Sequence, residues 1–69
     1  MIGYKLKSLR ESKGHSQEYM AIHCNIEQSS YSRLESGIIK PDFIKLRVIA
    51  KILDLDFHAL IDEMAKDSA

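Results

Sequence analysis

Four polar side chains between residues 28 and 33 have the types and the spacing of a hydrogen-bonding surface. They are Gln28, Ser29, Ser32 and Arg33. A helix over residues 27–36 would place all four along one face. An amide side chain can form two hydrogen bonds with the edge of an adenine base, and arginine can bond bases or phosphates. A solvated helix surface would have the same composition, so this alternative stays open.

The apolar residues of the same segment favour a functional role for its polar face. Only Tyr31 and Leu34, three residues apart, would point inward from this helix. So short an apolar stripe gains little from core contact. We therefore expect the polar face to have a purpose beyond solvation.

No group of residues in the chain predicts catalysis or metal binding. The sequence contains no nucleophile–base pair, no pair of carboxylates and no glycine-rich phosphate loop, so an enzyme is not expected. His15, His23 and His58 form no HxxxH pair, and the single Cys24 excludes an internal disulfide and a multi-cysteine zinc site. We expect no metal, no cofactor and no small-molecule substrate.

The length of the chain indicates one small domain, which we expect to be intracellular. The chain has 69 residues and a formal net charge of zero. Residues 1–40 hold six basic and four acidic residues (+2), and residues 41–69 hold four basic and six acidic residues (−2). Binding to nucleic acid needs local positive charge, which this asymmetry supplies only weakly. No signal peptide and no membrane-spanning run are apparent, so we expect a cytoplasmic protein with no membrane partner.

Capping signals and apolar spacing predict an all-α fold in a single domain over residues 1–69. Serine and aspartate favour helix starts at Ser16, Asp42 and Asp56. Glycine and asparagine favour helix ends at Gly14, Asn25 and Gly37. The predicted helices span residues 2–13, 16–24, 27–36, 42–53 and 56–66.

Each predicted helix has an apolar face that should point inward. The fourth helix carries a core stripe and a second apolar line that is a candidate partner surface. The apolar face of the fifth helix is the other candidate for a dimer surface. The core stripe is Phe43, Leu46, Ile49, Ala50 and Leu53; the second line is Ile44, Val48 and Ile52; the fifth-helix face is Phe57, Leu60, Ile61 and Met64; the first three helices contribute Ile2, Leu6, Leu9, Met20, Ala21, Cys24, Tyr31 and Leu34.

The spacing of these signals resembles the Cro/phage-repressor type (XRE-like) of helix-turn-helix domain, a group of bacterial and phage transcription regulators. The resemblance covers Leu9 to Leu60, about three quarters of the chain, without gaps. It is carried by Leu9-Arg10, Ser16-Gln17-Glu18, Met20-Ala21, Ile26, Ser32-Arg33-Leu34-Glu35, Gly37, Pro41 and Leu46 through Leu53. It implies a compact five-helix domain of the lambda-repressor-like type with a central helix-turn-helix.

The resemblance also implies roles for individual residues. Base contacts fall on Gln28, Ser29, Ser32 and Arg33, and phosphate contacts on Gln17, Ser30 and Lys40. Arg10 and Glu35 match a structural ion pair. Family members usually form homodimers through the C-terminal region, which favours Phe57, Ile61 and Met64 at the interface. A dimer would bind double-stranded DNA at two half-sites of an inverted repeat, about 34–36 Å apart.

Departures from the family pattern support a second interpretation. Ile38 and Ile39 stand where the family usually has basic residues, and Glu27 stands where a small hydroxyl residue is common. The neutral net charge, the Ile38-Ile39 loop and the second apolar line on the fourth predicted helix fit a helix-turn-helix fold used as a protein–protein interaction module with weak or no DNA binding. The sequence leaves the two interpretations to be separated by experiment.

Overall fold

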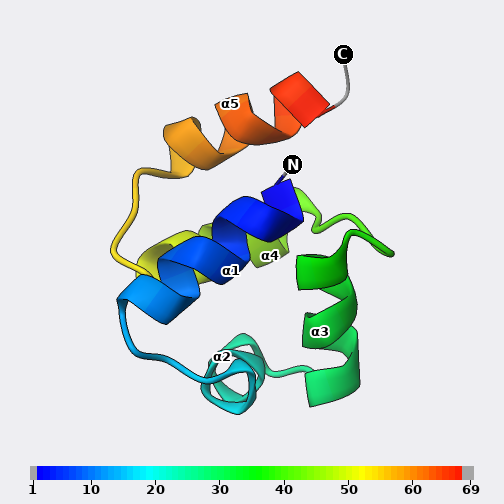
Figure 1. Ribbon diagram of the computed structural model, residues 1–69. Coiled ribbons are helices and arrows are strands. Elements are labelled where there is room, and N and C mark those ends of the chain that lie inside the picture. Colours follow the sequence, from blue (N-terminus) through cyan, green and yellow to red (C-terminus); the bar gives the residue numbers. More distant parts are fainter. Residues whose placement is uncertain (1, 68–69) are drawn as a thin grey trace.

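Five α-helices make up the computed structural model, which describes residues 2–67 (Figure 1). They are α1 (Ile2–Ser12), α2 (Gln17–Cys24), α3 (Gln28–Ser36), α4 (Phe43–Ile52) and α5 (Phe57–Asp67). No strand occurs in this part of the chain. The prediction of an all-α, five-helix fold is confirmed.

The helix ends follow from the chemistry of the capping residues. The Ser16 side chain accepts a hydrogen bond from the backbone N–H of Tyr19, and the Asp42 carboxylate accepts one from the N–H of Lys45. Both capping residues have extended backbone angles, so α2 and α4 begin one residue later than predicted. Asn25 (φ 57°) and Gly37 (φ 82°) end α2 and α3 in the left-handed conformation that their residue types tolerate best.

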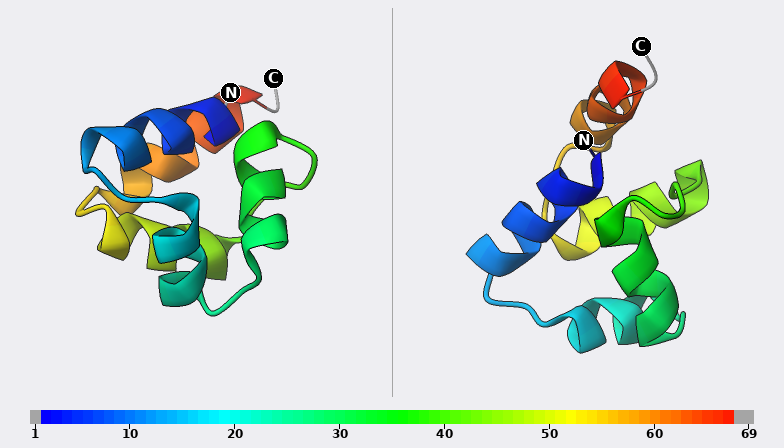
Figure 2. Two further views of the ribbon diagram at one scale, coloured as in Figure 1. Left: turned by 60° about the horizontal axis from the view of Figure 1, so that its bottom comes forward. Right: turned by 45° about the vertical axis from the view of Figure 1, so that its right-hand side comes forward.

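The core lies where α1, α2, α3 and α4 meet. α3 packs against both α1 and α2, while α4 packs against α2 and α5 (Figure 2). α5 covers the remaining side of α1. The buried apolar side chains are Ile2, Leu6, Met20, Ala21, Cys24, Tyr31, Leu34, Leu46, Ile49, Ala50, Leu53 and Leu60. α3 is thereby fixed on its inner side by two other helices.

Two expectations about α4 were wrong. Phe43 was predicted in the core, but its side chain is 61% exposed, because this first residue of α4 lines an open groove between α4 and α5. The predicted second line does not form one surface. Ile44 is 74% exposed, whereas Val48 and Ile52 pack against the core.

None of the helices within residues 2–67 is both long enough and apolar enough to cross a membrane.

Candidate nucleic-acid interface

The outer face of α3 presents the four polar side chains selected from the sequence. Gln28, Ser29 and Arg33 are exposed, and Ser32 is partly buried. The opposite side of α3 is buried, with Tyr31 fully inaccessible to solvent. In Figure 1, α3 stands at the edge of the molecule, with α1 and α2 on one side of it. The four side chains therefore form a polar surface on a rigidly held helix.

The connection between α2 and α3 is a tight turn of three residues. Asn25 closes α2, and the N–H of Ile26 returns to the carbonyl of Ala21 at 3.0 Å. Ile26 is half-buried and packs against the core, and Ala21 is small enough to let the helices approach closely. Glu27 precedes α3 in an extended conformation and makes no side-chain capping bond. Together α2, the turn and α3 form a helix-turn-helix.

A buried ion pair joins α1 to the last turn of α3. Arg10 Nε lies 2.6 Å from Glu35 Oε2, and Arg10 Nη2 lies 3.1 Å from Glu35 Oε1. Such a bidentate pair is among the stronger charged hydrogen bonds in proteins. The bond to Glu35 raises the pKa of Arg10. Burial alone would raise the pKa of Glu35, but the interactions of the carboxylate with Arg10, with the neighbouring Tyr31 hydroxyl and with Gln17 outweigh burial and lower it. Both groups are therefore charged at neutral pH.

Gln17 and Tyr31 complete the surroundings of Glu35. Gln17 Nε2 donates to Glu35 Oε1 at 3.1 Å, a bond that the sequence did not predict. The Tyr31 hydroxyl lies beside Glu35 but has no hydrogen-bond partner of good geometry among the described residues. Burial, and then the neighbouring carboxylate, raise the pKa of Tyr31 far above its ordinary value. Three helices thus converge on one carboxylate.

Ser30 and Lys40, the other two predicted phosphate contacts, line one hollow of about 290 Å³ beside α3. Lys45 lines the same hollow, and its Nζ donates to the carbonyl of Cys24 at 3.5 Å. Lys45 could not be predicted here from the sequence, because its place depends on how α4 packs against α2. Two lysines and a hydroxyl therefore border this side of α3. The Asp42 carboxylate lies there too.

An apolar groove of about 440 Å³ runs between α4 and α5, and all of its lining residues come from these two helices. Phe57 and Ile61, predicted for a dimer interface, line it and also pack against the core. The side chain of Met64, the third predicted interface residue, lies outside the described part of the structure. The groove is also lined by the exposed side chains of Phe43, which was predicted in the core, and Ile44, which was predicted in a candidate partner surface.

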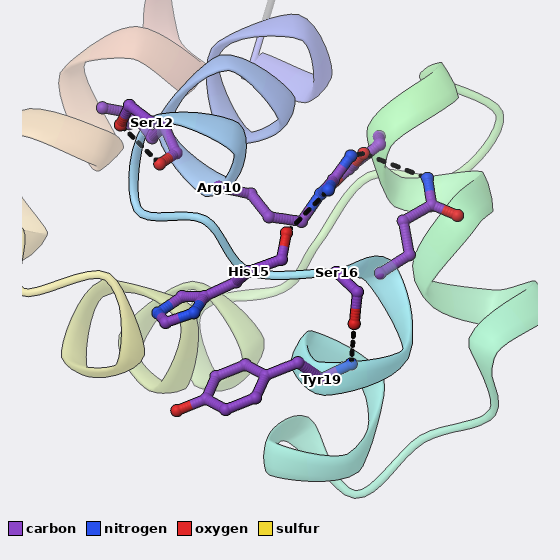
Figure 3. Close-up of polar contacts among 8 residues, drawn as sticks. Arg10, Ser12, His15, Ser16 and Tyr19 are labelled. Atoms are coloured by element: carbon purple, nitrogen blue, oxygen red, sulfur yellow. Dashed lines mark hydrogen bonds and ion pairs between the residues drawn. The ribbon is translucent and has the colours of Figure 1, made fainter.

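The histidines form no metal site in the described part of the chain, where no cluster of three or more potential ligands occurs. His15 instead stacks on the ring of Tyr19, and His23 packs against the same ring at a tilt of 38°, with each pair of ring centroids 4.2 Å apart. Figure 3 shows His15 and Tyr19 side by side, next to the Ser16 cap. Cys24 is buried, and burial raises the pKa of its thiol, so it behaves as an apolar core residue.

Comparison with known proteins agrees with this architecture. A family model described as helix-turn-helix matches residues 6–60. The chain belongs to the XRE-type helix-turn-helix family. Two of its relatives are described as HTH-type transcriptional regulators.

Two relatives come from Bacillus subtilis (strain 168). YonR, an SPbeta prophage-derived uncharacterized HTH-type transcriptional regulator, is 36% identical over 61 residues, covering 88% of this chain and 56% of YonR. The HTH-type transcriptional regulator SinR is 31% identical over 64 residues, covering 91% of this chain and 58% of SinR. The chain thus spans a little over half the length of these XRE-type relatives.

A solved structure has the same helical arrangement. The crystal structure of SinR, the master regulator for biofilm formation, in complex with DNA superposes with a TM-score of 0.79 at 29% identity. The match covers 88% of this chain and 98% of that one. The lambda-repressor-like prediction for the fold is confirmed.

Proposed function

We propose that this XRE-type domain is a sequence-specific double-stranded DNA-binding module of a transcriptional regulator. The observation that carries the proposal is the exposed polar face of α3, held against α1 and α2 by a buried apolar side and by Glu35. A helix of this kind fits the major groove, where base edges present donors and acceptors. The likeness to a SinR structure described as a DNA complex supports this proposal.

Base contacts are assigned to the outer face of α3 and phosphate contacts to its two flanks. Gln28, Ser29, Ser32 and Arg33 would contact base edges. Ser30 and Glu35 are five residues apart, about 140° around the helix, so Lys40 beside Ser30 and Gln17 beside Glu35 border different sides of α3. Phosphates on the two DNA strands that lie on either side of the major groove would contact these two flanks of α3.

The active form is proposed to be a homodimer that binds an inverted repeat in the cytoplasm, where bacterial DNA resides. The apolar groove between α4 and α5 supports this, because Phe43 and Ile44 expose large apolar surface beside Phe57 and Ile61. Contiguous exposed apolar surface is typical of interaction sites. Two copies would place their α3 helices about 34–36 Å apart on one face of the duplex.

A protein-interaction module is the second candidate. Ile38 is 72% exposed in the loop after α3, where positive charge would favour DNA, and Ile39 is exposed beside it. In this case the polar face of α3 would bind protein instead of DNA.

Selection from a randomised duplex pool, followed by fluorescence anisotropy at two salt concentrations, separates the two functions. We expect enrichment of an inverted repeat, with affinity that falls steeply as salt rises. Arg33→Ala should weaken binding to the selected duplex by about 1–3 kcal/mol. Lys51→Ala, which removes the same charge from an exposed site on α4, is the matched control and should change little. Absence of any enriched sequence would favour the protein-interaction module.

A further inference from the structure

The side-chain amide of Gln17 is held in one orientation by Glu35. Gln17 is the first residue of α2 and is half-buried, and its Nε2 donates to Glu35 Oε1 at 3.1 Å. Because a carboxylate only accepts hydrogen bonds, it selects the nitrogen of the amide and not the oxygen. That nitrogen carries two hydrogens, and this bond uses only one of them.

Glu35 is itself fixed, so it can hold Gln17 in place. Its side chain is 3% exposed and accepts two hydrogen bonds from Arg10. Arg10 Nη1 also donates to the carbonyl of His15 at 2.9 Å, two residues before Gln17 (Figure 3). These bonds close a ring that ties the last turn of α3 to α1 and to the start of α2.

We propose that Glu35 is a positioning residue, which holds the Gln17 amide so that its second N–H donates to a DNA phosphate oxygen. This inference rests on the proposed function. An unrestrained glutamine would lose rotational freedom on binding, a cost that the bond to Glu35 removes in advance. Arg10 neutralises the carboxylate, which limits its repulsion of a nearby phosphate. Glu35 acts through Gln17 and itself touches no DNA.

A double-mutant cycle on DNA affinity tests this role. The affinities of the wild type, Gln17→Ala, Glu35→Gln and the double variant are measured for the selected duplex, with the folded fraction of each established by circular dichroism. We expect Gln17→Ala to weaken binding about tenfold, as for loss of one hydrogen bond to a charged group. Glu35→Gln should weaken binding severalfold. The double variant should bind about as weakly as Gln17→Ala alone.

Lys40→Ala provides the matched control, because Lys40 lies on the other flank of α3, away from Glu35. The fold-losses in DNA affinity caused by Lys40→Ala and Glu35→Gln should multiply in a double variant, since the two sites share no contact. If the fold-losses in DNA affinity caused by Gln17→Ala and Glu35→Gln multiply in the double variant, the positioning role is overturned and the proposed function stands. Tighter binding by Glu35→Gln would also overturn it, by showing that the carboxylate mainly repels phosphate. Failure of the wild type to bind any selected duplex would overturn both proposals.

If Glu35→Gln does not fold, Glu35→Asp is the variant that tests the positioning role. This change keeps the negative charge opposite Arg10 but shortens the side chain by one methylene, which draws the carboxylate away from Gln17. We expect Glu35→Asp to weaken DNA binding severalfold and to shift the Nε2 resonances of Gln17 toward those of a free side chain. Unchanged affinity with shifted resonances would overturn the inference.

Discussion

Gly3 lies directly against the backbone carbonyl of Glu35, so close that a Cβ atom at residue 3 would be 2.5 Å from that oxygen. The carbonyl of Leu34 would be 2.7 Å from the same atom. α1 therefore approaches the last turn of α3 at a position where a side chain has no room. This contact sets the distance between α1 and α3 near the Arg10–Glu35 ion pair.

Gly3→Ala should destabilise the domain, although alanine is the better helix former. The clash is with rigid backbone, so α1 must shift, and overpacking of this kind costs about 1–3 kcal/mol. The gain in helix propensity, about 1 kcal/mol, offsets part of this cost. Urea denaturation of Gly3→Ala measures the balance, with Ser8→Ala at an exposed site of α1 as control. A more stable Gly3→Ala variant would contradict the close approach.

Stability should fall in acid as the Glu35 carboxylate is protonated. Its folded pKa lies below the ordinary 4.5, so the unfolded chain takes up this proton more readily than the folded one. The ion pair therefore contributes its full stability above pH 4.5 and loses it as the pH falls through the folded pKa.

Glu35→Gln isolates this contribution. At pH 7 it leaves Arg10 buried and unpaired, at an expected cost of about 3–5 kcal/mol. Free energies of unfolding for the wild type and the variant, measured from pH 7 to pH 2.5, should converge below pH 4.5. A difference that stays constant over this range would show that the folded pKa is not lowered.

Tyr31→Phe should leave the stability unchanged or raise it by up to about 1 kcal/mol, because it removes a buried hydroxyl without a well-placed partner. Thermal unfolding of the variant measures this effect. Tyr4→Phe removes the same group from a side chain that is 73% exposed and should be neutral. A loss of stability in Tyr31→Phe beyond that of the control would show that the hydroxyl donates to Glu35.

Ile44→Glu should prevent association of two copies, since it places a charge in the apolar groove between α4 and α5. Sedimentation equilibrium should show a monomer, and binding to a two-half-site duplex should weaken more than binding to one half-site. Ile22→Glu, at a similarly exposed isoleucine on α2, is the control and should leave association unchanged. Equal association in both variants would place the interface elsewhere.

The predictions from local sequence signals were the successful ones. Ser16, Asn25, Gly37 and Asp42 each adopt the capping or terminating conformation expected of their residue types. Such conformations depend on the residue and its neighbours within one turn. Phe43 shows the limit of apolar periodicity. Its register matched the core stripe, but only the other four members of that stripe, Leu46, Ile49, Ala50 and Leu53, are buried.

The sequence by itself determined the five helices, their ends and the polar face of α3, because spacing and capping act within a few residues. Only the tertiary structure decided which distant groups meet. Gln17 is 18 residues from Glu35, Lys45 is 21 residues from Cys24, and their hydrogen bonds exist because α2 packs against both α3 and α4. The same packing left Phe43 and Ile44 exposed in a groove that no local pattern defines. Contacts between helices depend on how whole faces fit together, which no single stretch of sequence encodes.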